Sequence, residues 1–245
     1  MKKTILILTT LFQVCLLQAQ TAFFSQVKIE YEKTVAVPAL FREMEPSWFE
    51  RIKDRLPQES KSYFEFIADN DKSVFKPGKE MPYDPRSPYQ PMADKNVVYT
   101  DYSTSTSISQ KPVFEETFLV TDSLVHIKWK ITNDTRVIAG FECRKAIGIL
   151  YDTIAVFAFY SDQIMIPGGP EGIQGLPGMI LGMGIPRLHT TWFATKVEVN
   201  NVPVSLIVPA KKGKKTNRTD MLNTVRTAMK DWSSYGQKML LAFMI

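Results

Sequence analysis

Histidine and cysteine, whose side chains often act as catalytic base and nucleophile, are rare in this chain of 245 residues. There are two histidines, His126 and His189, and two cysteines, Cys15 and Cys143. Hydrolytic catalysis needs a nucleophile, a base and an orienting group that converge in space. Neither histidine lies in a recognised catalytic motif, and the sequence has no Gly-x-Ser-x-Gly elbow, phosphate-binding loop or His-Glu-x-x-His helix. We therefore expect a protein that is not an enzyme and has no catalytic residues.

Cys143 and His126 both fall in segments that alternate like β-strands. Cys143 lies between apolar Phe141 and Lys145, where a thiol behaves as a small buried hydrophobic side chain and is unreactive. His126 alternates with its apolar neighbours and is expected to face solvent. Cys15 lies in an N-terminal apolar run that is predicted below to be removed as a signal peptide. Cys143 is then the one remaining cysteine and cannot close an intramolecular disulfide.

A metal site is the alternative function that specific residues suggest. Met165, Met179, Met183 and His189 lie in one region of the sequence, and thioethers with an imidazole suit Cu(I). Methionine also fills gaps in cores, and these methionines follow no repeated spacing. We prefer the core interpretation and assign no metal ligand and no cofactor. A periplasmic copper-handling protein that uses this Met/His cluster remains the alternative function.

The stretch from Ile164 to Leu181, IMIPGGPEGIQGLPGMIL, encodes a backbone path and supplies almost no side-chain chemistry. Seven of the chain's 12 glycines fall between Gly168 and Gly184. Glycine permits positive φ and close backbone approach, while proline fixes φ and removes a donor. We expect a structural turn that inserts Leu176 and Ile180 against a sheet. The residues assigned to this signature loop are Gly169, Pro170, Gly175, Leu176, Pro177 and Gly178.

The elements that must position these residues are mostly strands, because apolar and polar residues alternate in many short runs. Helical spacing predicts one helix over 46–56 and another over 219–245, the latter weakened at Gly236. Pro38 is expected to end the first strand, and turns are expected at 69–71, 122–123 and 133–134. Residues 77–95 contain five prolines and are expected to form a surface loop. The predicted strands cover residues 27–37, 62–67, 73–75, 97–102, 116–120, 125–131, 135–147, 153–160 and 190–200.

These elements define the expected fold class as α+β and mainly β. Alternating strands have one covered face, so a single curved antiparallel sheet with covering helices is the expected architecture. By looser analogy this arrangement is similar to the half-barrel of periplasmic lipoprotein carriers such as LolA, a likeness that says little about ligand.

The two ends of the chain differ in character from its body. Residues 1–19 combine Lys2 and Lys3 with a short apolar run, which predicts a cleaved signal peptide, and bulky neighbours of Cys15 argue against lipidation. Residues 20–245 are then a single domain with a basic C-terminal helical tail, since 209–245 carry eight Lys/Arg against two Asp. Within this tail, the KKGKK run at 211–215 is either a solvated linker or a contact for anionic lipid or an acidic partner. The apolar end, 239–245, is expected to dock into the core, and nucleic acid is not an expected partner.

Several blocks together resemble the GLPGLI family of exported envelope proteins. GLPGMIL at 175–181 is similar to the family's signature, with Met179 in place of a leucine. Residues 127–131 and 138–146 look like its strand pair, and Phe159-Tyr160 looks like the aromatic strand that leads into the signature loop. The resemblance covers roughly residues 115–200.

This resemblance implies a location and a general role. The family is one of uncharacterised function, and the resemblance implies a protein of the periplasm or cell envelope that is an accessory to TonB-dependent uptake at the outer membrane. Together with the absence of catalytic motifs, this predicts a non-enzymatic ligand-binding or accessory module. The expected partner is a small hydrophobic ligand or an envelope protein. Peripheral contact with the outer membrane or with a TonB-dependent transporter is also implied.

Overall fold

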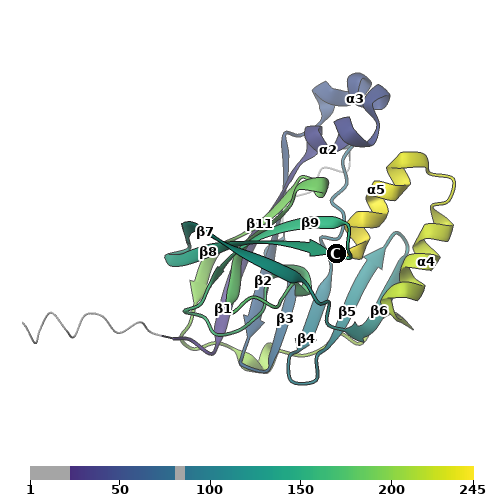
Figure 1. The fold of residues 1–245 in the computed structure, drawn as a ribbon. Helices are drawn as coiled ribbons and strands as arrows, with labels where there is room; N and C mark the ends of the chain where they lie inside the picture. The colour runs from purple at the N-terminus through teal and green to yellow at the C-terminus, as the bar shows by residue number, and fades with distance from the viewer. Residues whose placement is uncertain (1–22, 81–85) are drawn as a thin grey trace, which may run out of the picture.

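One curved β-sheet of 12 strands organises the residues that the computed structural model describes, 23–80 and 86–245 (Figure 1). Its strands are β1 (Val27–Ala36), β2 (Glu59–Ala68), β3 (Lys72–Pro77), β4 (Val97–Asp101), β5 (Thr106–Val113), β6 (Glu116–Ser123), β7 (Lys128–Ile138), β8 (Phe141–Leu150), β9 (Ile154–Ser161), β10 (Met179–Ile185), β11 (Thr190–Glu198) and β12 (Lys214–Thr216). Their order in the sheet is β12-β6-β5-β4-β3-β2-β1-β11-β10-β9-β8-β7. All neighbours are antiparallel except β12 and β6. The predicted fold class, mainly β with one curved sheet, is confirmed.

β1 lies in the middle of this sheet, between β2 and β11. Its odd-numbered residues Val27, Ile29 and Tyr31 are fully buried, whereas Glu30 is exposed. This period of two follows from the pleat of a strand, and a slip of one residue would turn the whole buried set to solvent.

The helices lie beside and above the sheet. Figure 1 shows α2 (Val37–Met44) and α3 (Pro46–Ile52) at the top, and α4 (Arg218–Ala228) and α5 (Ser233–Met244) next to β5 and β6. Four short 3-10 turns complete the described elements: η1 (Lys53–Arg55), η2 (Pro170–Gly172), η3 (Pro186–Leu188) and η4 (Val204–Leu206).

Two groups of buried apolar side chains form the core. The larger lies between the sheet and the signature loop, and the smaller lies between α2, α3, α4 and the strands β5 and β6. α5 connects them, because Leu241 and Ile245 belong to the first group while Met239 and Phe243 belong to the second. The expected docking of the apolar chain end into the core is therefore confirmed.

Three details of the strand prediction are wrong. β7 runs straight through Asn133 and Asp134, where a turn was expected, because an irregular register between Ile131 and Thr135 absorbs them. The turn lies instead at Ala139 and Gly140, both at positive φ. β6 extends to Ser123 through the other expected turn, and β5 and β10 had not been predicted as strands. The turn at Asp69 is confirmed, since its Oδ1 accepts from the N–H groups of Asp71 and Lys72 at 3.0 and 2.8 Å.

The helix boundaries also differ from prediction. Val37 and Pro38 begin α2 rather than end the strand, because the first helical turn does not need the N–H that proline lacks. The C-terminal helix is divided into α4 and α5 at residues 229–232, and Gly236 lies inside α5. No helix in the described ranges is long and apolar enough to cross a membrane. The predicted signal peptide and Cys15 fall outside the described residues.

Candidate functional site

The signature loop links β9 to β10 and holds its shape through its own backbone. Gly175 N donates to Pro167 O at 3.2 Å, and Ile180 N donates to Gly168 O at 2.9 Å. Gly178 has φ 152°, and a Cβ there would lie 2.2 Å from the carbonyl oxygen of Ser161. Only glycine fits this position, because both the backbone conformation and the space exclude a side chain.

Leu176 and Ile180 leave this loop toward the larger core, where they are 2% and 0% exposed. The Tyr31 hydroxyl of β1 donates to Ile180 O at 2.5 Å and joins the loop to the middle of the sheet. Gly169 is extended, at φ −179°, and a Cβ there would lie 2.8 Å from the Ile180 side chain. Pro170 is buried at the start of η2.

The same loop also carries a titratable side chain into the interior, which the sequence had not indicated. Glu171 is only 8% exposed and has the left-handed φ of 55°, a strained conformation for a residue with a side chain. Its Oε2 accepts from Asn96 Nδ2 at 3.1 Å, and its Oε1 has no hydrogen-bond partner among the described residues. Burial raises the pKa of the Glu171 carboxyl, an effect that Lys33 and Lys111 partly oppose.

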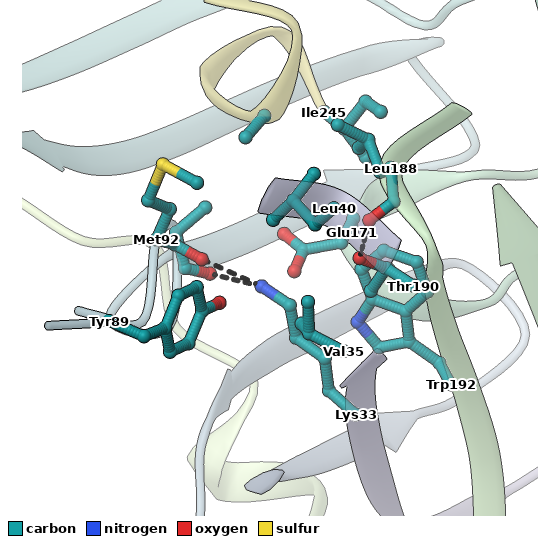
Figure 2. Close-up of a pocket in the computed structure, with 12 residues that line it drawn as sticks. Lys33, Val35, Leu40, Tyr89, Met92, Glu171, Leu188, Thr190, Trp192 and Ile245 are labelled. Carbon is teal, nitrogen blue, oxygen red and sulfur yellow. Dashed lines mark hydrogen bonds between the residues drawn. The ribbon is translucent and has the colours of Figure 1, made fainter. Parts of the chain in front are cut away.

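Lys33 approaches Glu171 from β1, where it occupies the inward phase of the alternation. Its Nζ donates to the carbonyl oxygens of Met92 and Ala93 at 2.9 and 3.3 Å and lies 5.4 Å from the centre of the Trp192 ring (Figure 2). Burial lowers its pKa, while the negative charge of Glu171 acts in the opposite direction.

Lys111 approaches from β5, whose inward residues also include Ser107, Ser109 and Val113. Its Nζ donates to the main-chain oxygens of Phe243, in α5, and of Ile245, which follows α5, at 3.3 and 2.5 Å. Burial lowers the pKa of Lys111 to about 8. A neutral amine is thus accessible to this side chain at mildly alkaline pH.

Two small cavities flank Glu171. One, of about 20 Å³, lies on the Lys33 side, between β1, β11 and Tyr89 (Figure 2). The other, of about 40 Å³, lies on the Lys111 side and is lined by the two serines of β5 and by Arg218. The first has room for about one water molecule and the second for two or three, whereas a site for a drug-sized ligand measures roughly 300–1,000 Å³. The buried cluster of Lys33, Lys111, Glu171 and Asn96 therefore suits proton exchange and close polar chemistry among its own members.

The residues that the sequence singled out lie elsewhere. His126 is exposed in the link between β6 and β7, not within a strand as expected. His189 follows η3 with φ 48°, and its Nε2 lies 2.9 Å from Glu43 Oε1. Cys143 is fully buried, and burial raises its pKa to about 12, so the thiol stays protonated.

The four residues of the copper hypothesis are separated by burial. Met179 and Met183 are both fully buried in the core, whereas Met165 is 56% exposed. Within the described ranges, no three His, Cys, Asp or Glu side chains are grouped to hold a metal ion. The KKGKK run differs from a plain linker, because Lys214 and Lys215 belong to β12 and pair in parallel with β6.

The hairpin of β7 and β8 exposes more large hydrophobic side chains than any other pair of strands in the described residues. β7 pairs with β8 on one side, and no other described strand pairs with its outer edge. Eleven large hydrophobic side chains are exposed among the described residues, and four of them lie on this hairpin: Ile131 (41%), Val137 (69%), Ile147 (43%) and Ile149 (48%). Five Lys/Arg against Asp134 and Glu142 give residues 128–150 a formal charge of +3.

Lys33, Lys111 and Glu171 were missed by sequence reasoning, although a signal existed for Lys33. It shares the parity of Val27, Ile29 and Tyr31, so the alternation itself places a lysine in the core. Lys111 offered no such signal, because β5 is too polar to be recognised as a strand. Glu171 lies in a glycine-rich segment that sequence reasoning interpreted only for its backbone conformation.

Comparison with known proteins supports the fold alone. No family model and no curated protein matches the chain. Among solved structures, "Structure of PNGF-II in P21 space group" is similar with a TM-score of 0.53 at 13% identity, covering 86% of this chain and 34% of that one. "Structure of PNGF-II in C2 space group" gives a TM-score of 0.50 at 14% identity, over 85% and 33% of the two chains. This chain thus spans about a third of the length of PNGF-II, and such identities carry no activity across.

Proposed function

We propose that this protein is a non-enzymatic, exported module of the cell envelope that binds another protein through the hairpin of β7 and β8. The observation that carries the proposal is the outer edge of β7, with which no other described strand pairs and which lies next to the exposed side chains of Ile131, Val137, Ile147 and Ile149. An open edge presents unpaired N–H and C=O groups, to which an extended segment of a partner adds as a further strand.

The charge of the hairpin indicates the chemistry of the partner. A second copy of this chain would bring the same formal charge of +3 to the edge, so pairing between copies is disfavoured. An acidic extended segment complements Lys128, Lys130 and Arg136 along β7. The proposed occupant is therefore an acidic strand of a different envelope protein, and the GLPGLI resemblance suggests an outer-membrane uptake system as its setting.

A small hydrophobic ligand has less support. The larger core is filled by side chains from the sheet, the signature loop and α5, and the cavities beside Glu171 measure about 20 and 40 Å³. Copper handling also has less support, since its candidate residues divide between the core and the surface. Export rests on the leader pattern of residues 1–19.

The test places a photo-crosslinking amino acid at Val137 of the full chain in cells, with Val208 as a matched control position. Both side chains are more than half exposed, but Val208 lies on the segment between β11 and β12, outside the hairpin. We expect one dominant adduct at Val137, absent at Val208, whose linked peptide is acidic and comes from another protein. The double variant Lys128→Glu/Lys130→Glu should abolish this adduct.

Other results count against the proposal. Equal adducts at both positions, an adduct with a second copy, or an adduct indifferent to the charge reversal would each reject the β7 edge as the binding surface. Fractionation of the same cells tests export, because full-length protein that retains Met1 in the cytoplasm would contradict it.

A further inference from the structure

Asn96, Lys111 and Glu171 form a buried group of three that the proposed function does not use. They come from the residue before β4, from β5 and from the signature loop, and they are 1%, 8% and 8% exposed. An amide, an amine and a carboxyl buried together are reactants and catalyst for one reaction, the transfer of an acyl group from the amide nitrogen to the amine nitrogen.

The strand register brings the two reacting side chains together. β4 and β5 are antiparallel, and Val97 pairs with Gln110 at the end of the ladder. When this register is extended by one residue beyond the last pair, Asn96 lies directly opposite Lys111. Directly opposed residues have Cβ atoms about 4.5–5.5 Å apart, within the reach of a lysine side chain.

Hydrogen bonds give a second measure of this proximity. The main-chain oxygen of Ile245 accepts from Lys111 Nζ at 2.5 Å and from Asn96 Nδ2 at 3.4 Å. The amine and the amide nitrogen therefore lie no farther apart than the sum of these two distances. Glu171 Oε2 lies 3.1 Å from the same Nδ2, and its Oε1 has no described partner.

Burial prepares the protonation states that the reaction needs. A nucleophilic amine must be neutral, and burial lowers the pKa of Lys111 to about 8. A neutral amine has two N–H donors, which the oxygens of Phe243 and Ile245 accept, and it keeps one lone pair. Burial also raises the pKa of Glu171, which favours the proton-donating form beside Nδ2.

The geometry points to an intramolecular isopeptide bond between Lys111 and Asn96, with Glu171 as the proton carrier. The lone pair of Lys111 Nζ attacks Asn96 Cγ, and a new C–N bond forms. Glu171 gives its proton to Nδ2 and regains one from Nζ. The bond between Cγ and Nδ2 then breaks, and one ammonia leaves. No oxidant, metal or other reactant is required.

Such a bond would tie the end of β4 to β5 covalently. The predicted mature chain has one cysteine, which is buried, and so has no disulfide for this purpose. The reaction occurs once in each molecule, so it is consistent with a protein that turns over no substrate.

The experiment is mass spectrometry of the purified, folded full chain, followed by proteolysis. We expect an intact mass one ammonia below that of the sequence and a linked pair of peptides that contain Asn96 and Lys111. The peptide map is essential, because cyclisation of an N-terminal Gln20 also releases ammonia. In Lys111→Arg and Glu171→Gln the linked pair should be absent.

Two variants make the test decisive. Lys130→Arg changes an exposed lysine of β7, outside the buried group, and should leave the link intact. Asn96→Asp should give the same linked pair with loss of water in place of ammonia, which identifies the leaving group. The proposal is overturned if folded wild-type protein yields Asn96 and Lys111 only in separate peptides, or if the link persists in Lys111→Arg.

Discussion

The cluster around Glu171 and the hairpin of β7 and β8 place charged side chains in opposite surroundings. Around Glu171, two lysines and one carboxyl share the interior with Trp192, and each amine donates to main-chain oxygens. On the hairpin, five basic side chains surround an apolar surface that stays in contact with water. Buried charges must be paired or neutral, whereas exposed charges contribute little to stability. The first region therefore affects the stability of the fold, whereas the second is the surface through which the proposed partner would bind.

The largest loss of stability is expected from a substitution at Leu176. Leu176→Ala truncates a side chain that is 2% exposed and should lower the free energy of unfolding by about 3–4 kcal/mol, in the middle of the usual range of about 2–5 kcal/mol for a buried leucine. Leu206→Ala is the control, because Leu206 is 47% exposed and its loss should change stability by less than about 0.5 kcal/mol. Urea unfolding measures both, and equal values would contradict a structural role for the signature loop.

Gly178→Val should lower the free energy of unfolding by about 3 kcal/mol, near the upper end for a strained backbone position. The new Cβ meets the carbonyl of Ser161, which belongs to the backbone and cannot move aside. Gly140→Val isolates the conformational part, because Gly140 has φ 87° with no atom within 4 Å of the position that a Cβ would take, and it should lose about 1 kcal/mol. A Gly178→Val protein that kept its thermal stability but lost its partner would make the loop a recognition element.

The titration of Lys111 makes the stability of the protein depend on pH. Its pKa is about 8 in the fold against 10.5 for an ordinary lysine, so the unfolded chain binds more protons between these values and stability rises with pH there. The Asn96→Ala variant, which cannot form the proposed isopeptide bond, should gain about 2 kcal/mol from pH 7 to pH 10 relative to Asn96→Ala/Lys111→Met. Wild-type protein should lack this gain if Lys111 is already an amide. A gain of equal size in wild type would indicate a free amine.

The smallest change in stability is expected on the hairpin. Val137→Ser alters a side chain that is 69% exposed and should change the free energy of unfolding by less than about 0.5 kcal/mol. The same substitution should remove the crosslinked adduct when the photo-reactive group is moved to Ile149. Loss of stability in Val137→Ser, measured by urea unfolding, would show that this surface is part of the fold rather than a contact for a partner.

Strands with a regular alternation of apolar and polar residues could be predicted from the sequence. Strands whose inward positions hold polar residues or glycine were missed. β1 and β11 alternate cleanly and were found. β5 turns Ser107, Ser109 and Lys111 toward a polar cavity, so its inward face does not look apolar. β10 was hidden because Gly182 and Gly184 leave room for the rings of Phe193 and Phe157.

The candidate site could be predicted only in part for a related reason. Glycine and proline in the signature loop indicated a fixed backbone path, and Leu176 and Ile180 do enter the core. Nothing in the local sequence pattern indicated that the backbone of this loop turns Glu171 inward, toward lysines from β1 and β5. Contacts between residues so distant in the sequence follow from the sheet order, which periodicity alone does not give.

The position of β1 has a consequence for the order of folding. One edge of β1 pairs with β11, and Thr195 Oγ1 donates to Glu30 O across 165 residues. Contacts so distant in the sequence form slowly, so β1 gains its second neighbour only after most of the chain has been made. Consecutive strands from β1 to β6 can pair while the chain grows, but the outer edge of β1 stays open until β11 has been made. A truncation before Thr190 would leave the buried row of β1 beside an open edge and should aggregate.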